Sequence, residues 1–147
     1  MTSTGRVLGI DLGSRRVGVA VSDSAGSMAM PYEVLQRSAA GHGEDHRRLA
    51  ELVEETGASL VVIGLPLSMD GSVGPAATAA MAEAGELRAV LDVVGVPVET
   101  FDERLTTVSA DRNLVQQRMR ADARRRVVDK VAAAVMLQAW LDSRGRP

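Results

Sequence analysis

Three acidic residues are candidates for chemistry because each lies in or close to an apolar segment, where a carboxylate is unusual. They are Asp11, Glu103 and Asp129. Asp11 interrupts an otherwise apolar segment, and burying a carboxylate there costs free energy unless something compensates its charge. Glycines on either side, Gly9 and Gly13, favour a binding site because they let a ligand or another backbone come close. The alternative is that Asp11 begins a turn and accepts hydrogen bonds from nearby backbone N–H groups.

Asp129 lies in the run VVDKVAAAVMLQAWL, which is apolar on nearly every side. A helix of this kind is largely buried, and burial disfavours an ionised carboxylate unless a cation or a donor compensates. Lys130 is a poor partner because neighbours on a helix point about 100° apart. The alternative is a capping or arginine-paired aspartate near a helix start; we favour the site, since perturbed carboxylates gather at functional sites.

Glu103 and its neighbour Asp102 follow the apolar segment VPVETF. Ligand sites collect at the carboxyl ends of strands in parallel sheets, so both carboxylates are candidates. Alternatively, Asp102 caps a turn while Glu103 pairs with Arg104. The residues alone leave open which of the two acids belongs to a site.

Carboxylates that converge from separate elements repel one another, and a divalent cation removes that repulsion. Ligands that offer only oxygen suit Mg²⁺ or Mn²⁺ rather than zinc. Such ions can activate a water and stabilise the leaving oxygen in phosphodiester cleavage. We therefore predict that Asp11, Glu103 and Asp129 hold Mg²⁺ or Mn²⁺ and act as catalytic residues.

The elements that must position these residues follow from hydrophobic periodicity. Strands are predicted at 6–12, 17–23, 28–36, 59–65 and 96–101, and helices at 44–56, 75–94, 106–118 and 123–143. The turn Gly13-Ser14-Arg15 joins the first two strands as a hairpin, and Pro31 places the third at an edge or a bulge. Strands that first meander and then alternate with helices predict a mixed sheet covered by helices on both sides.

Composition narrows the class of protein. The chain has 147 residues, 46% of them hydrophobic, which indicates one domain over 1–147. There is no cysteine, which excludes disulfides and thiolate metal sites. Neither a secretory signal nor an apolar run of about 20 residues is found, so we expect a soluble cytoplasmic protein that does not associate with membranes.

Charge is unevenly distributed although the net charge is only −2. The stretch from Arg112 to Lys130 holds seven basic and two acidic residues, which makes it locally basic. A basic edge on a neutral domain is typical of a surface that faces phosphates, and two ordinary solvated helix ends could also produce it. Aromatic residues amount to 2%, so we expect contacts with phosphates and nucleic-acid shape rather than base stacking.

Four ordered motifs carry a resemblance that covers nearly the whole chain: GIDLGSRRVGVAVSD, VVIGLPLSMDGS, FDERLTTVSA and VDKVAAAVMLQAWL. Together they resemble the YqgF family, also called RuvX, of bacterial RNase H-like nucleases. The resemblance implies a five-stranded mixed sheet, an antiparallel meander followed by parallel strands, with flanking helices. It also implies a cytoplasmic endonuclease that either matures the 5′ end of pre-16S rRNA or resolves Holliday junctions.

The resemblance also assigns residues. The family's first-strand acid corresponds to Asp11, the acid of its D-E-R motif to Glu103 and that of its last helix to Asp129. The positions that match motif residues for binding phosphates or the acids are Arg16, Arg104, Thr106 and Thr107. The basic run adds Arg124, Arg125 and Arg126 as further substrate-binding candidates.

One position departs from the related RuvC resolvases, which resemble this pattern but place another aspartate one turn after the helix acid. Here that position is Ala132, so Asp102, Asp23 or water would have to complete the coordination of two ions. The same departure motivates an alternative of another class, a non-catalytic nucleic-acid or ribosome-associated binding factor. A third alternative, an actin-like phosphotransferase, needs a longer chain than this one.

The remaining expectations concern partners and one histidine pair. We expect structured nucleic acid, either pre-rRNA or branched DNA, contacts with assembling ribosomes, and a monomer or a homodimer. His42 and His46 are spaced i,i+4, but HGEDH does not place its glutamate where a zinc-protease helix has it. We therefore interpret the pair as part of a solvated helix start.

Overall fold

The computed structural model describes residues 5–67, 70–103 and 121–144, and for 121–130 it describes the backbone alone. The described elements, in chain order, are β1 (Arg6–Leu12), β2 (Arg16–Ser22), β3 (Ala29–Gln36), α1 (His42–Thr56), β4 (Ala58–Leu65), α2 (Pro75–Asp92), β5 (Val98–Asp102) and α4 (Ala121–Arg144). The predicted helix at 106–118 lies outside the described residues.

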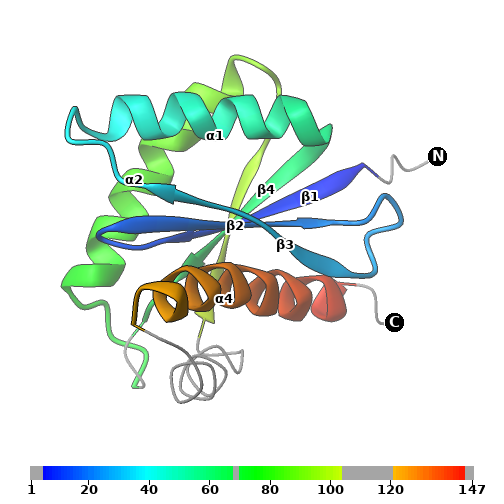
Figure 1. Ribbon diagram of the computed structural model, residues 1–147. Helices are drawn as coiled ribbons and strands as arrows, with labels where there is room; N and C mark the ends of the chain where they lie inside the picture. The colour runs from blue at the N-terminus through cyan, green and yellow to red at the C-terminus, as the bar shows by residue number, and fades with distance from the viewer. Residues whose placement is uncertain (1–4, 68–69, 104–120, 145–147) are drawn as a thin grey trace.

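The strands form one mixed sheet in the order β3-β2-β1-β4-β5. The β1–β2 and β2–β3 pairs are antiparallel, and the β1–β4 and β4–β5 pairs are parallel. Helices α1 and α2 cover one face of the sheet and α4 covers the other (Figure 1). The predicted fold, an antiparallel meander followed by parallel strands with helices on both faces, is confirmed.

The predictions for the third strand are also confirmed. Strand β3 lies at one edge of the sheet. Its pairing with β2 shifts register beside Pro31, because Val19 pairs with Glu33 while the next residue, Ala20, pairs with Pro31. One residue of β3 is therefore extra, which is a bulge, as expected where a proline cannot donate to the ladder.

Alternation along the strands divides the apolar core between the two faces. On the α1/α2 face, Leu8 and Ile10 of β1 are fully buried among residues of both helices. On the α4 face, the apolar cluster consists of Val7, Ala20, Val62, Ala132, Ala133, Met136, Leu137, Trp140 and Leu141. Gly9 brings α4 close to β1 there, because a Cβ on Gly9 would lie 2.8 Å from Cβ of Leu137.

The observed ends of the elements differ from the predicted ones by a few residues at most. Helix α1 starts at His42, two residues before the predicted start. It ends where Gly57 takes a left-handed conformation at φ 71°, which glycine adopts without steric cost. Within the described part of the chain, no helix is both long and apolar enough to cross a membrane.

Candidate active site

Asp11 lies at the carboxyl end of β1 and is 8% exposed. It is on the α4 face of the sheet, because it alternates with Val7 and Gly9. Its partner across the β1–β2 ladder is Gly18, which has no side chain to fill the neighbouring space. No side chain of Gly18 therefore occupies the space beside Asp11 on the α4 face.

The structure separates Glu103 from Asp102. In β5, Val98 packs in the α1/α2-side core while Phe101 packs against the α4-side cluster. Alternation therefore directs Asp102 to the α1/α2 face and Glu103, the residue after the strand, to the α4 face. Of the two neighbours, Glu103 is the one that shares a face with Asp11.

The side chain of Glu103 lies over Gly64 of β4. A Cβ on Gly64 would lie 2.9 Å from Cγ and 3.0 Å from Cδ of Glu103. Gly64 follows Ile63, which pairs with Ile10 of β1, so Gly64 and Asp11 are at the same level of adjacent strands. Asp11 and Glu103 therefore approach the same place on the α4 face, from either side of a glycine.

Helix α4 runs antiparallel to β5 and so points its amino-terminal half toward this place. Near its carboxyl end, Nη1 of Arg144 lies 3.7 Å from Oε1 of Glu99 at the start of β5. Further back, Cγ of Met136 lies 3.1 Å from the Cβ position of Gly64, beside Glu103. Position 129 comes seven residues before Met136, about 10 Å further toward the carboxyl ends of the strands.

Asp129 lies within α4 on the helical row that continues to Ala133 and Met136, both fully buried against the sheet. The side chain of Asp129 is outside the described atoms. Ala132, where RuvC-like patterns have an acid, is fully buried in the α4-side cluster. That position therefore contributes packing on the sheet and no carboxylate.

Asp23 does not belong to this site. It follows β2 at the opposite end of the sheet from Asp11, and it closes its own loop. Its carboxylate accepts hydrogen bonds at 2.8 Å from both the backbone N and Oγ of Ser27, and at 3.2 Å from the N of Met28. These bonds, led by the backbone N–H of Ser27, lower the pKa of Asp23. The suggestion that Asp23 completes a metal site is wrong.

Of the predicted substrate-binding residues, the structure describes the side chain of Arg16 alone. Arg16 begins β2 and alternates with Ala20 of the α4-side cluster, so it shares the face of Asp11. Three of the residues, Arg104, Thr106 and Thr107, lie outside the described residues. The arginines Arg124, Arg125 and Arg126 lie in α4, and their side chains are likewise outside the description.

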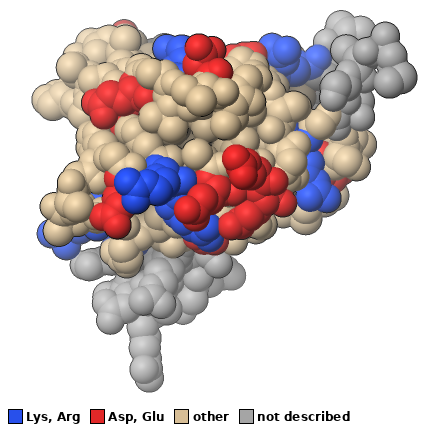
Figure 2. All heavy atoms as spheres, turned by 90° about the horizontal axis from the view of Figure 1, so that it is seen from above, with Lys and Arg blue, Asp and Glu red and all other residues tan. Residues whose placement is uncertain are grey.

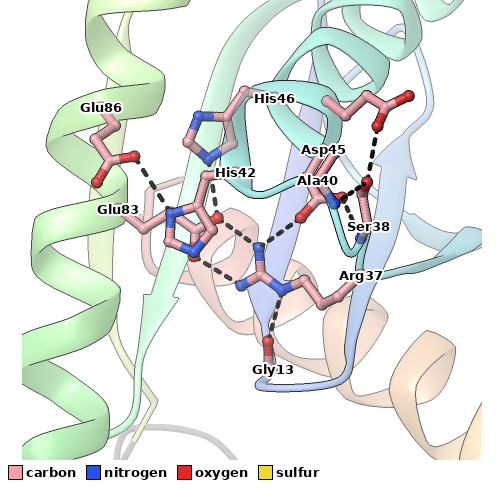
Figure 3. A network of polar contacts seen from close by, with 10 residues as sticks. Gly13, Arg37, Ser38, Ala40, His42, Asp45, His46, Glu83 and Glu86 are labelled. Atoms are coloured by element: carbon pink, nitrogen blue, oxygen red, sulfur yellow. Dashed lines mark hydrogen bonds and ion pairs between the residues drawn. The ribbon is translucent and has the colours of Figure 1, made fainter.

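A buried ionic network on the opposite face escaped the sequence analysis (Figure 3). The guanidinium of Arg37 forms two parallel hydrogen bonds to Glu83 of α2, at 2.6 and 2.7 Å. It also lies 3.2 Å from Asp45 of α1, and its Nε donates to the backbone oxygen of Gly13 at 3.0 Å. Because Gly13 belongs to the turn after β1, the network holds the hairpin that carries Asp11.

The pKa of the Glu83 carboxyl reflects this network. Burial acts to raise the pKa, but hydrogen bonds from Arg37 and His46 outweigh it and lower the pKa below its usual value. Glu83 is thus held as an anion although its side chain is only 4% exposed. The hydrogen bond to Glu83, followed by the contact with Asp45, raises the pKa of Arg37.

The histidine interpretation needs correcting. His42 is half-exposed, but His46 is buried, and its Nε2 lies 2.9 Å from Oε2 of Glu83. His46 belongs to the network rather than to a solvated helix start. Helical spacing could have found this, because His46 stands on the same side of α1 as Leu49 and Val53.

A pocket of about 340 Å³ opens beside this network. It lies between the hairpin turn at Gly13 and Ser14 and the facing sides of α1 and α2. The outer face over α1 carries acidic and basic side chains intermingled, not one continuous basic area (Figure 2). Arg48, for example, contacts Glu51 and Glu55 at 3.0 and 2.9 Å. Among the described residues, the α1 face therefore lacks the charge pattern expected for phosphate binding.

The fold defines the class of protein. It is similar to Thermus thermophilus RuvC in complex with a Holliday junction substrate, with a TM-score of 0.62, 19% identity and 95% of each chain covered. It is also similar to the fowlpox virus Holliday junction resolvase, with a TM-score of 0.55, 10% identity and coverage of 94% and 98%. The chain therefore has the RNase H-like fold of the resolvases.

Sequence comparison identifies the family within this class. The model of RuvX, described as Holliday junction resolvase, matches residues 5–143, so the chain belongs to the RuvX family. A Mycobacterium ulcerans protein named "Putative pre-16S rRNA nuclease" is 48% identical over 97% of this chain and 82% of its own length. An Enterococcus faecalis protein of the same name is 43% identical, with coverage of 96% and 99%.

Proposed function

We propose that this chain is a metal-dependent endonuclease that cleaves phosphodiester bonds in structured nucleic acid, processing the 5′ end of pre-16S rRNA. The observation that carries the proposal is that Glu103 lies over Gly64 while Asp11 stands at the same level on the adjacent strand, at the carboxyl edge of an RNase H-like sheet. The relatives named for pre-16S rRNA support the choice of substrate.

The residues of the site fit a hard divalent cation. Asp11 and Glu103 offer only oxygen donors, which suits Mg²⁺ or Mn²⁺. Gly64 leaves the space beneath Glu103 free of a side chain that would push the carboxylate away. We propose that Asp11, Glu103 and Asp129 hold the cation, which when bound supplies an activated water and charge stabilisation for the leaving oxygen.

The chain itself orients the reacting groups and the substrate. Burial of Asp11 in the sheet and the hydrogen bond from Arg37 to Gly13 fix the hairpin, so the carboxylate keeps its position when substrate binds. Arg16, on the same face, is proposed to bind a substrate phosphate. The further phosphate-binding residues in this proposal are Arg104, Thr106, Thr107, Arg124, Arg125 and Arg126.

A second candidate function is the resolution of Holliday junctions. The description of the matching family model favours it. Both candidates use the same carboxylates and differ in the nucleic acid that fits over them. A cytoplasmic location and a monomeric or homodimeric state belong to either proposal and remain predictions.

The test is a cleavage assay on precursor rRNA and on a four-way DNA junction, with Mg²⁺, with Mn²⁺ and with a chelator. The wild type should cleave the precursor at its 5′ side only when a divalent ion is present. Asp11→Asn should abolish cleavage, while the control Asp23→Asn, at the far end of the sheet, should cleave as the wild type does.

The outcomes separate the candidates. Faster cleavage of the junction than of the rRNA would replace the first substrate by the second. Binding of either substrate without cleavage under every metal condition would overturn the enzyme and favour a binding factor. Undiminished cleavage by Asp11→Asn would refute the proposed site.

A further inference from the structure

Two histidines and a glutamate meet where α1 contacts α2, on the opposite face of the sheet from Asp11 (Figure 3). His42 and His46 stand one turn apart on α1, and Glu86 stands on α2. One ligand atom from each of the three side chains lies within 4.8 Å of the others. Nδ1 of His42 lies 3.3 Å from Oε1 of Glu86.

We propose that His42, His46 and Glu86 form a second metal site, which binds zinc. Two imidazoles and one carboxylate are the donor set of many zinc sites, with a water as the fourth ligand. Mg²⁺ prefers oxygen ligands and octahedral geometry, so this site and the carboxylate site select different ions.

The spacing of the side chains fits a tetrahedral ion. Histidines at i and i+4 project from the same side of a helix, and their rings here have centroids 5.6 Å apart. Bonds of about 2.0–2.1 Å to zinc place tetrahedral ligand atoms about 3.3 Å from one another. The side chains of His42 and Glu86 are 49% and 54% exposed, so both can close the remaining distance without disturbing the core.

The buried neighbours supply the support that metal-binding histidines usually have. Nε2 of His46 lies 2.9 Å from Oε2 of Glu83, whose other oxygen accepts a hydrogen bond from Arg37. This contact fixes the orientation of the His46 ring where α1 meets α2. Glu83 thereby orients the one ligand that is buried, at 3% side-chain exposure for His46.

The location gives the ion a structural consequence. A bound ion would join α1 to α2 directly. It would also contact the chain of hydrogen bonds from His46 through Glu83 and Arg37 to the oxygen of Gly13. Zinc should therefore stabilise the end of the molecule that holds the hairpin of Asp11, without binding Asp11 itself.

The experiment is a titration of the full chain, first stripped of metal, with Zn²⁺ in the presence of a chromophoric chelator. Wild type should bind one zinc ion per chain at high affinity and unfold at a higher temperature when zinc is present. His42→Asn and Glu86→Gln, which alter half-exposed side chains, should each weaken zinc affinity at least tenfold and lose the thermal shift.

Two controls make the result specific. Glu54→Gln changes an exposed glutamate elsewhere on α1 and should bind zinc as the wild type does. Asp11→Asn should also keep full zinc affinity, because the carboxylate site is on the other face. Co²⁺ in place of zinc should give the intense visible absorption of a tetrahedral site in the wild type and lose it in His42→Asn.

Three results would overturn the site. One is wild-type affinity for zinc no higher than that of His42→Asn. Another is zinc affinity lost in Asp11→Asn but kept in Glu86→Gln, which would assign the ion to the carboxylates. If a variant fails to fold, the absorption of the Co²⁺-loaded wild type decides, and weak octahedral bands would contradict the proposal.

Discussion

The two faces of the sheet differ in how their charged side chains are arranged. On the α1/α2 face, Arg37 lies between Glu83 and Asp45, so opposite charges are matched within hydrogen-bond distance. On the α4 face, two acidic residues share one region: Glu103 lies over Gly64, and Asp11 stands at the same level on the adjacent strand β1. The first arrangement pairs opposite charges within the fold, whereas the second places two acidic residues on one face, where we propose that a cation binds.

The α1/α2 face and the α4 face also differ in their packing. The α1/α2 face is filled by large side chains such as Leu8, Ile10 and Ile63. The α4 face uses small residues where the helix crosses the strands, and a Cβ on Gly9 or Gly64 would collide with its neighbours. On the α4 face, glycines therefore let α4 and Glu103 come close to the strands, whereas the α1/α2 face is filled by large side chains from both sides. Each prediction below tests one part of this difference.

The largest effect should come from breaking the matched charges. Arg37→Ala leaves Glu83 and Asp45 buried without their cation, which should lower the free energy of unfolding by about 3 kcal/mol. Arg48→Ala removes a cation of α1 whose partners are solvent-exposed, and it should leave the unfolding midpoint nearly unchanged. Urea unfolding of both variants measures their free energies of unfolding. Equal losses of stability would show that burial does not make the Arg37 contacts more stabilising than the exposed ones of Arg48.

The next effect should come from the like charges on the α4 face. Glu103→Gln should lower the cleavage rate by about 100-fold or more, since even residues that only support metal ligands cost 10–100-fold. Asp102→Asn alters the adjacent carboxylate, which alternation directs to the other face, and it should keep most of the activity. Single-turnover cleavage rates of the two variants decide, and the reverse order would exchange their roles.

A smaller effect is expected from filling the space beneath Glu103. Gly64→Ala puts a Cβ 2.9 Å from Cγ of Glu103, so the carboxylate must move. A displacement of this size should slow cleavage about tenfold. The unfolding midpoint should also fall, because the new Cβ would lie 3.1 Å from Cγ of the fully buried Met136. Gly85→Ala is the matched control: it lies in α2 with no atom within 4 Å of its Cβ position, and it should be fully active. Equal activity of both variants would show that Glu103 needs no such space.

Much of the fold could be predicted because its signals are local. Alternation in 6–12 and 17–23, with Gly13 in the turn, fixes the hairpin, and Gly13 is required there because a Cβ would lie 2.5 Å from the oxygen of Arg16. Pro31 correctly indicated an edge strand and a bulge, since both follow from its missing N–H. These features depend on residues close in sequence, which is why one sequence sufficed.

The site could be predicted only in part because its contacts join distant residues. The face of Asp11 follows from alternation, but the choice between Glu103 and Asp102 needs the packing of Phe101 against α4. The pairing of Arg37 with Glu83 joins residues 46 apart, and the sequence shows nothing that links them. Asp23 was misjudged for the same reason, since only the strand register places it at the opposite end from Asp11.

The smallest effect should be a loss of stability at acid pH. Because its pKa is lowered in the folded protein, Glu83 contributes stability that is present above its unfolded pKa of about 4.3. That contribution is lost as pH falls through the lower folded value. Unfolding midpoints of the wild type should therefore fall below about pH 4.3. Glu83→Gln should be less stable than the wild type at neutral pH and fall less steeply below that value.

Asp23 supplies the comparison for this acid dependence. Its pKa is also lowered, by the N–H of Ser27, but these hydrogen bonds are exposed at the loop after β2, where solvent screens the charge. Asp23→Asn should therefore reduce the fall of the unfolding midpoint at acid pH by less than Glu83→Gln does. If Asp23→Asn reduces this fall more than Glu83→Gln does, protonation in the exposed loop causes the loss of stability at acid pH. The matched charges of the α1/α2 face would then be stable to protonation, and the difference between the two faces would lie in packing alone.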